Sequence, residues 1–280
     1  YLVYAYIYTQ GGSIVGEFRL IDVAASAQVM GKRLLASQGQ QRLVAHQFSD
    51  EVLNFVHRLT GIATSRIVFS GGATGKKEIY IADYDGANAK PLTSFGSISI
   101  KPKISPDGTK VVFVSYKDRY PFLYVLDIAT GKVTPLSRKP GINIAPNWAP
   151  DGQSLAIVLS KDGDTEIYRV NADGSNLKRL TNSRGVDTSP TFSPDGKQIA
   201  FVSERGGAPT IYVMNADGSA PRRLSRTYGK AFDPVWSPDG TKIAFVADYG
   251  GVRIAVINAD GSGVRTLTSQ GNSESPTWSS

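Results

Sequence analysis

The sequence predicts a mainly β protein in which a β-propeller of four-stranded blades follows a small, incomplete α/β domain. Three observations lead to this fold class. A Pro-Asp-Gly turn recurs every 44 residues, a second Asp-Gly turn keeps nearly the same spacing, and bulky apolar residues hold fixed places between them. A repeat of about this length, built from short strands, is typical of propellers, in which each unit forms one blade.

The Pro-Asp-Gly turn joins the first two strands of each unit. It occupies residues 105–108, 149–152, 193–196 and 237–240. Proline presets the first turn position, and glycine accepts the positive φ that a tight hairpin needs. In one unit the flanking strands are predicted at residues 189–192 and 198–203.

The remaining strands of that unit are predicted at residues 210–215 and, from the preceding stretch, 177–181. Four short antiparallel strands in about 40 residues indicate a propeller blade rather than a helical repeat. One small sheet cannot bury both of its faces, so neighbouring blades must pack on each other. The residues predicted to pack there are Phe69, Phe113, Ile157, Phe201 and Phe245.

The two ends of the repeat region suggest how the ring closes. The first unit begins at Arg66 without a preceding inner strand, and residues 275–278 read as a spare inner strand. We expect the spare strand to complete the first blade and give a five-bladed ring, which would remove an open sheet edge. The alternative is a chain cut inside a sixth blade.

Residues 1–62 lie outside the repeat and are predicted to form part of an α/β domain, with the propeller at 63–280. Residues 2–8 and 15–23 read as a hairpin that turns at Gly11-Gly12. A helix is predicted to begin at Ser49, because serine caps free amides and the following acids suit the positive end of the helix dipole.

Composition excludes several classes of function. The chain has no cysteine, which removes disulfide scaffolds, thiolate metal sites and cysteine nucleophiles. It has two histidines, no apolar run of membrane-spanning length and no Gly-x-Ser-x-Gly elbow. The net charge of +7 is spread along the chain without a basic stripe of interleaved aromatics, so nucleic-acid binding is not expected. We expect no catalytic residue, cofactor or metal.

Three segments lie before the propeller or at its start: Ala45 through His46 to Glu51, Thr60-Gly61-Ile62 and Ser65-Arg66-Ile67. Together with the repeated turns, they resemble the TolB family of the bacterial Tol–Pal system. The resemblance implies a periplasmic, non-enzymatic, monomeric adaptor that binds the lipoprotein Pal at the mouth of the propeller channel and supports outer-membrane integrity and cell division. It also implies six blades, whereas five units can be counted. The family's N-terminal TolA-binding extension is absent here, so no TolA contact is expected. The alternative is the propeller of a hydrolase or lyase, detached from its catalytic module.

Antiparallel topology places both Asp-Gly turns of a unit at one end of the blade and the loops that lead into the inner strands at the other. The turns repeat, while those loops differ from unit to unit, which favours a scaffold with a recognition rim. The alternative is that these loops differ only because nothing constrains their sequences. Within the resemblance, the positions that contact Pal match Ile142, Asn143, Ala145, Thr188 and Ser189. The full set of predicted partner-binding residues is Lys101, Ile142, Asn143, Ala145, Asp187, Thr188, Ser189, Phe232, Asp233 and Glu274. Phe232 and Tyr228 are predicted either to anchor an interface or to lie between blades.

Overall fold

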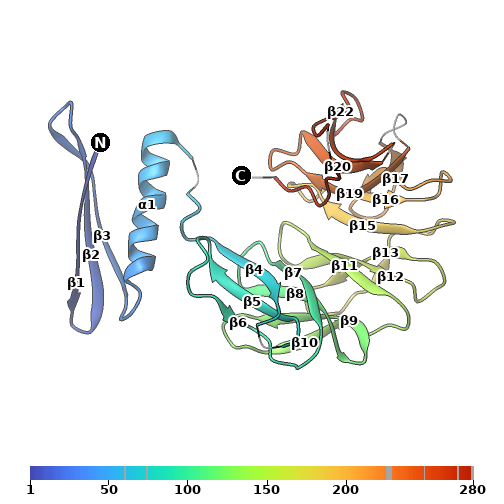
Figure 1. The fold of residues 1–280 in the computed structure, drawn as a ribbon, viewed down its shortest axis with the longest axis horizontal. Coiled ribbons are helices and arrows are strands. Elements are labelled where there is room, and N and C mark those ends of the chain that lie inside the picture. Colours follow the sequence, from blue (N-terminus) through green and yellow to red (C-terminus); the bar gives the residue numbers. More distant parts are fainter. Residues whose placement is uncertain (60, 74, 225–228, 249, 270, 279–280) are drawn as a thin grey trace. The chain divides into compact units, whose positions relative to one another are not determined.

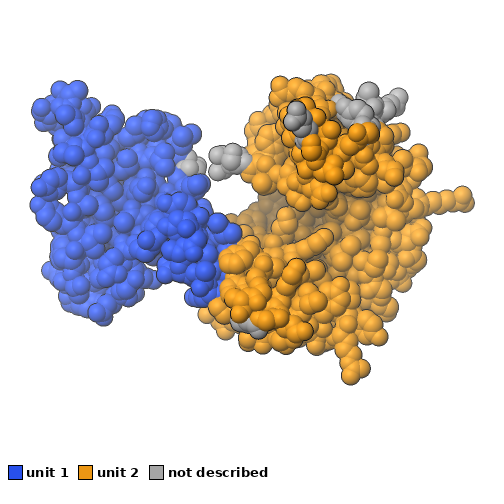
Figure 2. All heavy atoms as spheres, viewed as in Figure 1, with its two compact units in different colours: residues 1–67, 81–90 blue, residues 68–80, 91–280 orange. Residues whose placement is uncertain are grey.

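The structure is a computed structural model that describes residues 1–59, 61–73, 75–224, 229–248, 250–269 and 271–278. The chain divides into two compact units, one of residues 1–67 with 81–90 and one of residues 68–80 with 91–280 (Figure 2). The division at residues 62 and 63 stays a prediction.

The N-terminal unit contains a three-stranded antiparallel sheet and a helix (Figure 1). Its elements are β1 (Leu2–Gln10), β2 (Ser13–Asp22), β3 (Ala27–Ser37) and α1 (Gln41–His57). Phe18 of β2 stacks on Phe48 of α1 with ring centroids 4.5 Å apart, and Ile14 and Val44 complete this buried cluster. The hairpin of β1 and β2 is confirmed, whereas β3 was not predicted.

The helix begins well before its predicted start at Ser49, which is therefore wrong. The N-cap residue is Gln40, and its side chain makes no capping hydrogen bond. The residues read as a cap lie in the middle of the helix, where Asp50 has a different role. Its carboxylate accepts hydrogen bonds from the backbone nitrogen of Ala63 (2.7 Å) and from the backbone nitrogen and hydroxyl of Thr64 (3.0 and 2.8 Å).

The repeat units form antiparallel blades, as predicted (Figure 1). The first blade has three strands, β4 (Arg66–Gly71), β5 (Glu78–Asp83) and β6 (Lys90–Pro91). The second has β7 (Ser99–Ile104), β8 (Lys110–Asp118), β9 (Tyr120–Asp127) and β10 (Val133–Ser137). The third has β11 (Asn143–Trp148), β12 (Ser154–Leu159), β13 (Glu166–Asn171) and β14 (Lys178–Arg179). The fourth has β15 (Asp187–Phe192), β16 (Gln198–Ser203), β17 (Thr210–Asn215) and β18 (Arg222–Arg223). The prediction that residues 177–181 supply the remaining strand of this blade is wrong, because β14 pairs with β13 of the third blade. The fifth has β19 (Lys230–Trp236), β20 (Lys242–Asp248), β21 (Val252–Asn258) and β22 (Arg265–Thr266).

Bulky side chains pack between neighbouring blades, as predicted. One buried cluster joins Val112 of the second blade to Ile157 of the third, and another joins Val158 of the third to Phe201 of the fourth. Phe113, Ile157, Phe201 and Phe245 are all 0% exposed. Burying such a side chain contributes about 1.5–3 kcal/mol, so the packing between blades holds the unit together. Phe69 of the first blade is the exception, with 37% of its surface exposed.

The repeated turns also contact the neighbouring blade. A Cβ added at Gly152, Gly196 or Gly240 would lie 3.6–3.7 Å from Pro106, Pro150 or Pro194 of the preceding turn. At Gly218 and Gly261, in the second turn, it would lie 2.6 Å from the carbonyl oxygens of Leu180 and Leu224. Glycine is therefore needed there for close approach as well as for positive φ.

The aspartates of these turns are held in their charged form by local hydrogen bonds. The Ser105 hydroxyl and the Thr109 backbone and hydroxyl donate to Asp107 and lower its pKa to about 2, and Ser237 and Thr241 do the same for Asp239. Because the folded-state pKa lies below the unfolded value, this stabilisation is present above about pH 4 and is lost as the pH falls towards 2.

We expect NMR titration to give a midpoint near pH 2 for Asp107 and Asp239, and a higher midpoint for Asp239 after Ser237→Ala. The hydroxyl bond from Ser237 to Asp239, 2.6 Å long, is the largest cause of the lowered pKa. Asp107 in the same variant is the internal control. An unchanged Asp239 midpoint would show that the serine hydroxyl does not hold the charge.

Residues 271–278 lie against the fifth blade without forming a strand. The backbone nitrogen of Ser273 donates to Val252 O (3.2 Å), and the Trp278 indole nitrogen donates to Val235 O (3.0 Å). Within the described residues, β4 pairs only with β5, so the prediction that residues 275–278 complete the first blade is wrong. The indole bond joins the segment to the blade that precedes it.

Candidate partner-binding site

Each inner strand carries one residue with a left-handed backbone immediately before a proline. These residues are Lys101 (φ 53°), Ala145 (φ 49°), Ser189 (φ 49°) and Asp233 (φ 47°). The pairing register of every inner strand shifts at this place, which marks a β-bulge. Ser275 in the C-terminal segment has the same conformation, with φ 54°.

This backbone conformation is costly for the residues that adopt it. A non-glycine residue in the left-handed region loses about 1–2 kcal/mol relative to its preferred conformation, and a following proline restricts it further. A bulge bends its strand and redirects the side chain at the bulge. Strain of this kind persists where the surrounding structure enforces it, and it is concentrated at functional sites. The repeated bulge therefore marks the inner strands as the place to look for a site.

Neighbouring inner strands meet at these bulges. The Ser189 hydroxyl donates to Asp233 Oδ1 (3.1 Å), which links equivalent positions of the fourth and fifth blades. Nearer the turns, the Trp148 indole nitrogen donates to Lys103 O (3.0 Å), linking the third blade to the second. Ser189 and Asp233 are therefore brought together, although they lie 44 residues apart in the sequence.

Two of the predicted site residues are buried beneath this surface. Asn143 is 0% exposed; it accepts from the Ser137 hydroxyl (2.7 Å) and donates to Lys139 O and Gly141 O. Asp187 is also 0% exposed and is paired with Arg205 at 2.8 Å. Their side chains support the loops before the inner strands from inside the fold. In this conformation these two side chains cannot contact a partner directly.

The other predicted residues lie at or near the surface. Lys101, Ile142, Asp233 and Glu274 are exposed, whereas Ala145, Thr188, Ser189 and Phe232 are half-buried. Phe232 lies within β19 rather than in a loop, and Tyr228 lies outside the described residues. The exposed and half-buried members form a surface that we call the inner-strand mouth, made of Lys101, Ile142, Ala145, Thr188, Ser189, Phe232, Asp233 and Glu274.

Polar clusters at the hairpins between the second and third strands were missed from the sequence. In the second blade the Tyr124 hydroxyl donates to Asp118 (2.6 Å), and in the third the Tyr168 hydroxyl donates to Asp162 (2.6 Å). Burial, together with the adjacent carboxylate, raises the pKa of each tyrosine to about 12. The signal was present as a Lys-Asp pair six residues before the repeated tyrosine in both units.

Charged side chains at the hairpin of the second blade pair with one another within that blade. Lys117 and Arg138 both pair with Asp118, at 3.6 and 2.6 Å, and both lie over the Tyr124 ring. The hydrogen bond from Tyr124, followed by these cations, lowers the pKa of Asp118. The clusters fix the hairpins beside the inner-strand mouth.

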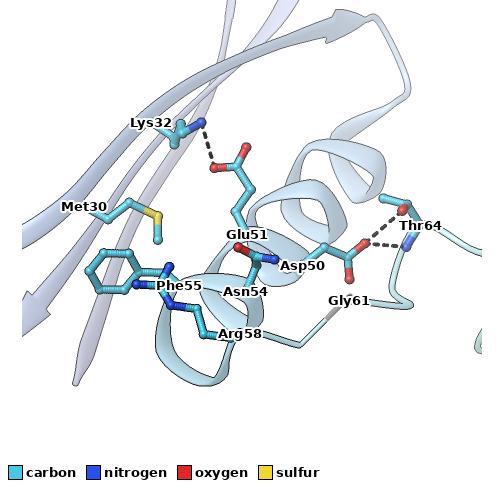
Figure 3. Close-up of a pocket in the computed structure, with 9 residues that line it drawn as sticks. All are labelled: Met30, Lys32, Asp50, Glu51, Asn54, Phe55, Arg58, Gly61 and Thr64. Atoms are coloured by element: carbon cyan, nitrogen blue, oxygen red, sulfur yellow. Dashed lines mark hydrogen bonds and ion pairs between the residues drawn. The ribbon is translucent and has the colours of Figure 1, made fainter. Parts of the chain in front are cut away.

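The N-terminal unit has a pocket between β3, α1 and the segment after the helix (Figure 3). Lys32 pairs with Glu51 at 2.9 Å, and Asp50 is occupied by the bonds to Ala63 and Thr64. A Cβ at Gly61 would lie 2.1 Å from Asp50 Oδ1, so glycine is required there. Most charged groups of the pocket thus tie the helix to its surroundings.

Among the described residues, no three His, Asp or Glu side chains are placed to hold a metal ion. His46 packs edge-on against the Tyr84 ring, with centroids 5.3 Å apart. None of the described helical residues belongs to a helix long and apolar enough to cross a membrane.

Known proteins share both the sequence and the fold. Residues 56–280 match the family model described as the TolB beta propeller domain. A Protein TolB homolog from Chlorobium chlorochromatii is 41% identical over 115 residues, which cover 41% of this chain and 26% of the relative. A Tol-Pal system protein TolB from Syntrophotalea carbinolica is 40% identical over 103 residues, covering 37% of this chain and 24% of the relative. The chain thus matches about a quarter of the length of these relatives.

Among solved structures, TolB from Acinetobacter baumannii aligns with a TM-score of 0.81 and 29% identity, over 95% of this chain and 68% of that one. The family match covers the blades and the end of α1, and the structural match extends over nearly the whole chain. Both agree with the strand order and the repeated turns described above. The chain therefore belongs to the TolB beta-propeller family.

Proposed function

We propose that this chain is a non-enzymatic periplasmic adaptor of the Tol–Pal system, which acts as a monomer and binds Pal at the inner-strand mouth. In this role it would support outer-membrane integrity and cell division. The observation that supports the proposal is the left-handed bulge, which recurs in the inner strands of blades two to five with a different side chain in each. The named relatives support the system in which the adaptor would act.

The chemistry of the mouth suits a protein partner. A cation, two carboxylates, small hydroxyls and the apolar Ile142 and Phe232 occur together, and Ile142 is 41% exposed. Mixed polar and apolar surfaces of this kind are typical of non-obligate protein interfaces. The buried Asn143 and Asp187 hold the loops before the inner strands in one conformation, which reduces the entropy lost on binding.

The absence of cysteine allows a direct test by site-specific labelling. We would place single cysteines at Ile142 and at Glu274, attach a bulky maleimide, and measure binding of the purified soluble domain of Pal by calorimetry. Both side chains are exposed, so labelling is expected to leave the fold intact. We expect each label to weaken binding at least tenfold, because it would occupy the surface that Pal covers.

Lys197→Cys provides the matched control. Its side chain is 82% exposed and lies next to the Asp-Gly turn at the opposite end of the fourth blade. The same label there is expected to change the affinity less than twofold. Equal binding by all labelled proteins would contradict the proposed docking surface. Turnover of peptide or glycan substrates by the chain alone would instead favour the hydrolase or lyase alternative.

A further inference from the structure

The hairpin between the second and third strands is longer in the second blade than in the third and fourth blades. β8 and β9 contain nine and eight residues, whereas the equivalent strands β12, β13, β16 and β17 contain six each. The longer strands end in a tight turn at Arg119, whose φ is 74°. The equivalent loops of the third and fourth blades use Gly163 and Gly207 at positive φ instead.

Large side chains are exposed on and beside this hairpin. Tyr120 is 65% exposed and Tyr116 is 39% exposed. Ile98 lies against the hairpin, since its carbonyl accepts from the Tyr116 backbone nitrogen at 2.9 Å, and it is 45% exposed. The equivalent loops of the third and fourth blades, residues 160–165 and 204–209, contain no aromatic residue. Exposed tyrosine beside arginine is characteristic of the energetically dominant parts of protein interfaces.

The same region carries an excess of positive charge. Lys117 and Arg138 share the one carboxylate of Asp118. Arg119 and Lys139 are exposed, and within the described part of the chain neither forms an ion pair with a carboxylate. The hairpin and the segment that follows β10 thus carry four cations, of which two pair with Asp118. The loop of the third blade is balanced differently, because Lys161 is matched by Asp162 and Asp164.

We infer that this surface, made of Ile98, Tyr116, Arg119, Tyr120 and Lys139, docks an acidic protein segment that also carries apolar or aromatic side chains. Charge complementarity selects the occupant, since the unpaired cations favour carboxylates and the exposed rings favour side chains that can stack on them. The left-handed turn places Arg119 at the tip of the hairpin, where its side chain is exposed. This contact goes beyond the proposed function, and it lies on blade two rather than across the inner strands.

The test uses a random Glu–Tyr copolymer as the probe, with polyglutamate, which lacks rings, and duplex DNA for comparison. The variant is Arg119→Gly, Tyr120→Thr and Lys139→Gln combined. Glycine relieves the positive φ and threonine suits a strand, so the variant is expected to fold. The matched control is Lys132→Gln with Lys197→Gln, which removes two exposed cations from the end of the blades that carries the Asp-Gly turns.

We expect the 280-residue chain to bind the copolymer more tightly than polyglutamate, with an affinity that falls as salt is added. The triple variant should lose at least tenfold in affinity, and the control less than twofold. The inference is overturned if the unmodified chain does not bind the copolymer, if the triple variant binds it equally well, or if duplex DNA binds these residues more tightly. The Pal labelling experiment is independent of all three outcomes, so a failure here leaves the proposed function standing.

Discussion

Gly218→Ala is expected to lower the free energy of unfolding by about 2–4 kcal/mol, as measured by urea denaturation. Gly218 has φ +94°, which costs an alanine about 1–2 kcal/mol. The added Cβ would also lie 2.6 Å from Leu180 O and 3.1 Å from Leu180 Cα in the neighbouring blade. Backbone atoms of a packed strand cannot move aside cheaply, so the clash adds to the strain and loosens the contact between the two blades.

Gly207→Ala separates the cost of the backbone conformation from the cost of the steric clash. Gly207 lies in the same blade with nearly the same φ of +95°, but a Cβ there meets no atom within 4 Å. It should therefore cost only the conformational part, about 1–2 kcal/mol. Equal losses for the two variants would mean that the contact with Leu180 is relieved without cost and that the blades are less tightly packed than we describe.

Arg205→Met is expected to destabilise the protein by about 3 kcal/mol, because it leaves a charge buried without its counterion. Asp187 is 0% exposed, and Arg205 Nη2 lies 2.8 Å from its Oδ2. The Ser183 hydroxyl at 3.0 Å is the second group that donates to this carboxylate. Removing one partner of a buried ion pair typically costs about 3–5 kcal/mol, and the lower figure applies here because the arginine is 22% exposed.

The double variant Arg205→Met, Asp187→Asn tests that explanation by thermal denaturation. Methionine retains apolar contact with Phe201 and Tyr212, over whose rings the guanidinium now lies at 5.3 and 5.1 Å. Asparagine is the residue at the equivalent place of the third blade, Asn143, where it is fully buried. We expect the double variant to recover most of the lost stability. If it is as unstable as the single variant, lost packing and not the unpaired charge is the cause.

The propeller could be predicted from the sequence because each blade repeats the same local chemistry. The Pro-Asp-Gly turn fixes one hairpin, and the continuous apolar run at residues 199–202 is what a strand buried on both faces requires. The observed β15, β16 and β17 match their predicted ranges within two residues. Here local propensity and packing between blades favour the same conformation.

The N-terminal unit was harder to predict because its signals are weak or ambiguous. β3 has no clear alternation, since Gly31 and the adjacent Leu34 and Leu35 interrupt it. The start of α1 has no capping side chain, while the cap-like residues at Ser49 and Asp50 serve a contact further along the chain. A contact between residues 13 positions apart cannot be read from local sequence.

The candidate site stays a prediction, for which the sequence indicated positions but not the burial of each side chain. The sequence showed where the loops before the inner strands vary, and the bulge was also visible as a residue followed by proline at Lys101, Ala145, Ser189 and Asp233. The burial of Asp187 could not be foreseen, because it depends on Arg205 in the loop after the second strand of the same blade. The extended hairpin of the second blade was missed for a similar reason, since strand length there depends on pairing beyond the repeated core.

Successive Pro-Asp-Gly turns contact each other in the same way, so one blade can replace another without changing the contact between neighbours. Gly152, Gly196 and Gly240 each meet the proline of the preceding copy at nearly the same spacing, so the contact between successive blades is the same at all three junctions. Natural or engineered chains can therefore gain, lose or shuffle whole 44-residue units while every new junction finds a matching neighbour. Diversity in such a lineage would accumulate in the hairpins and in the loops before the inner strands, where no equivalent spacing has to be kept.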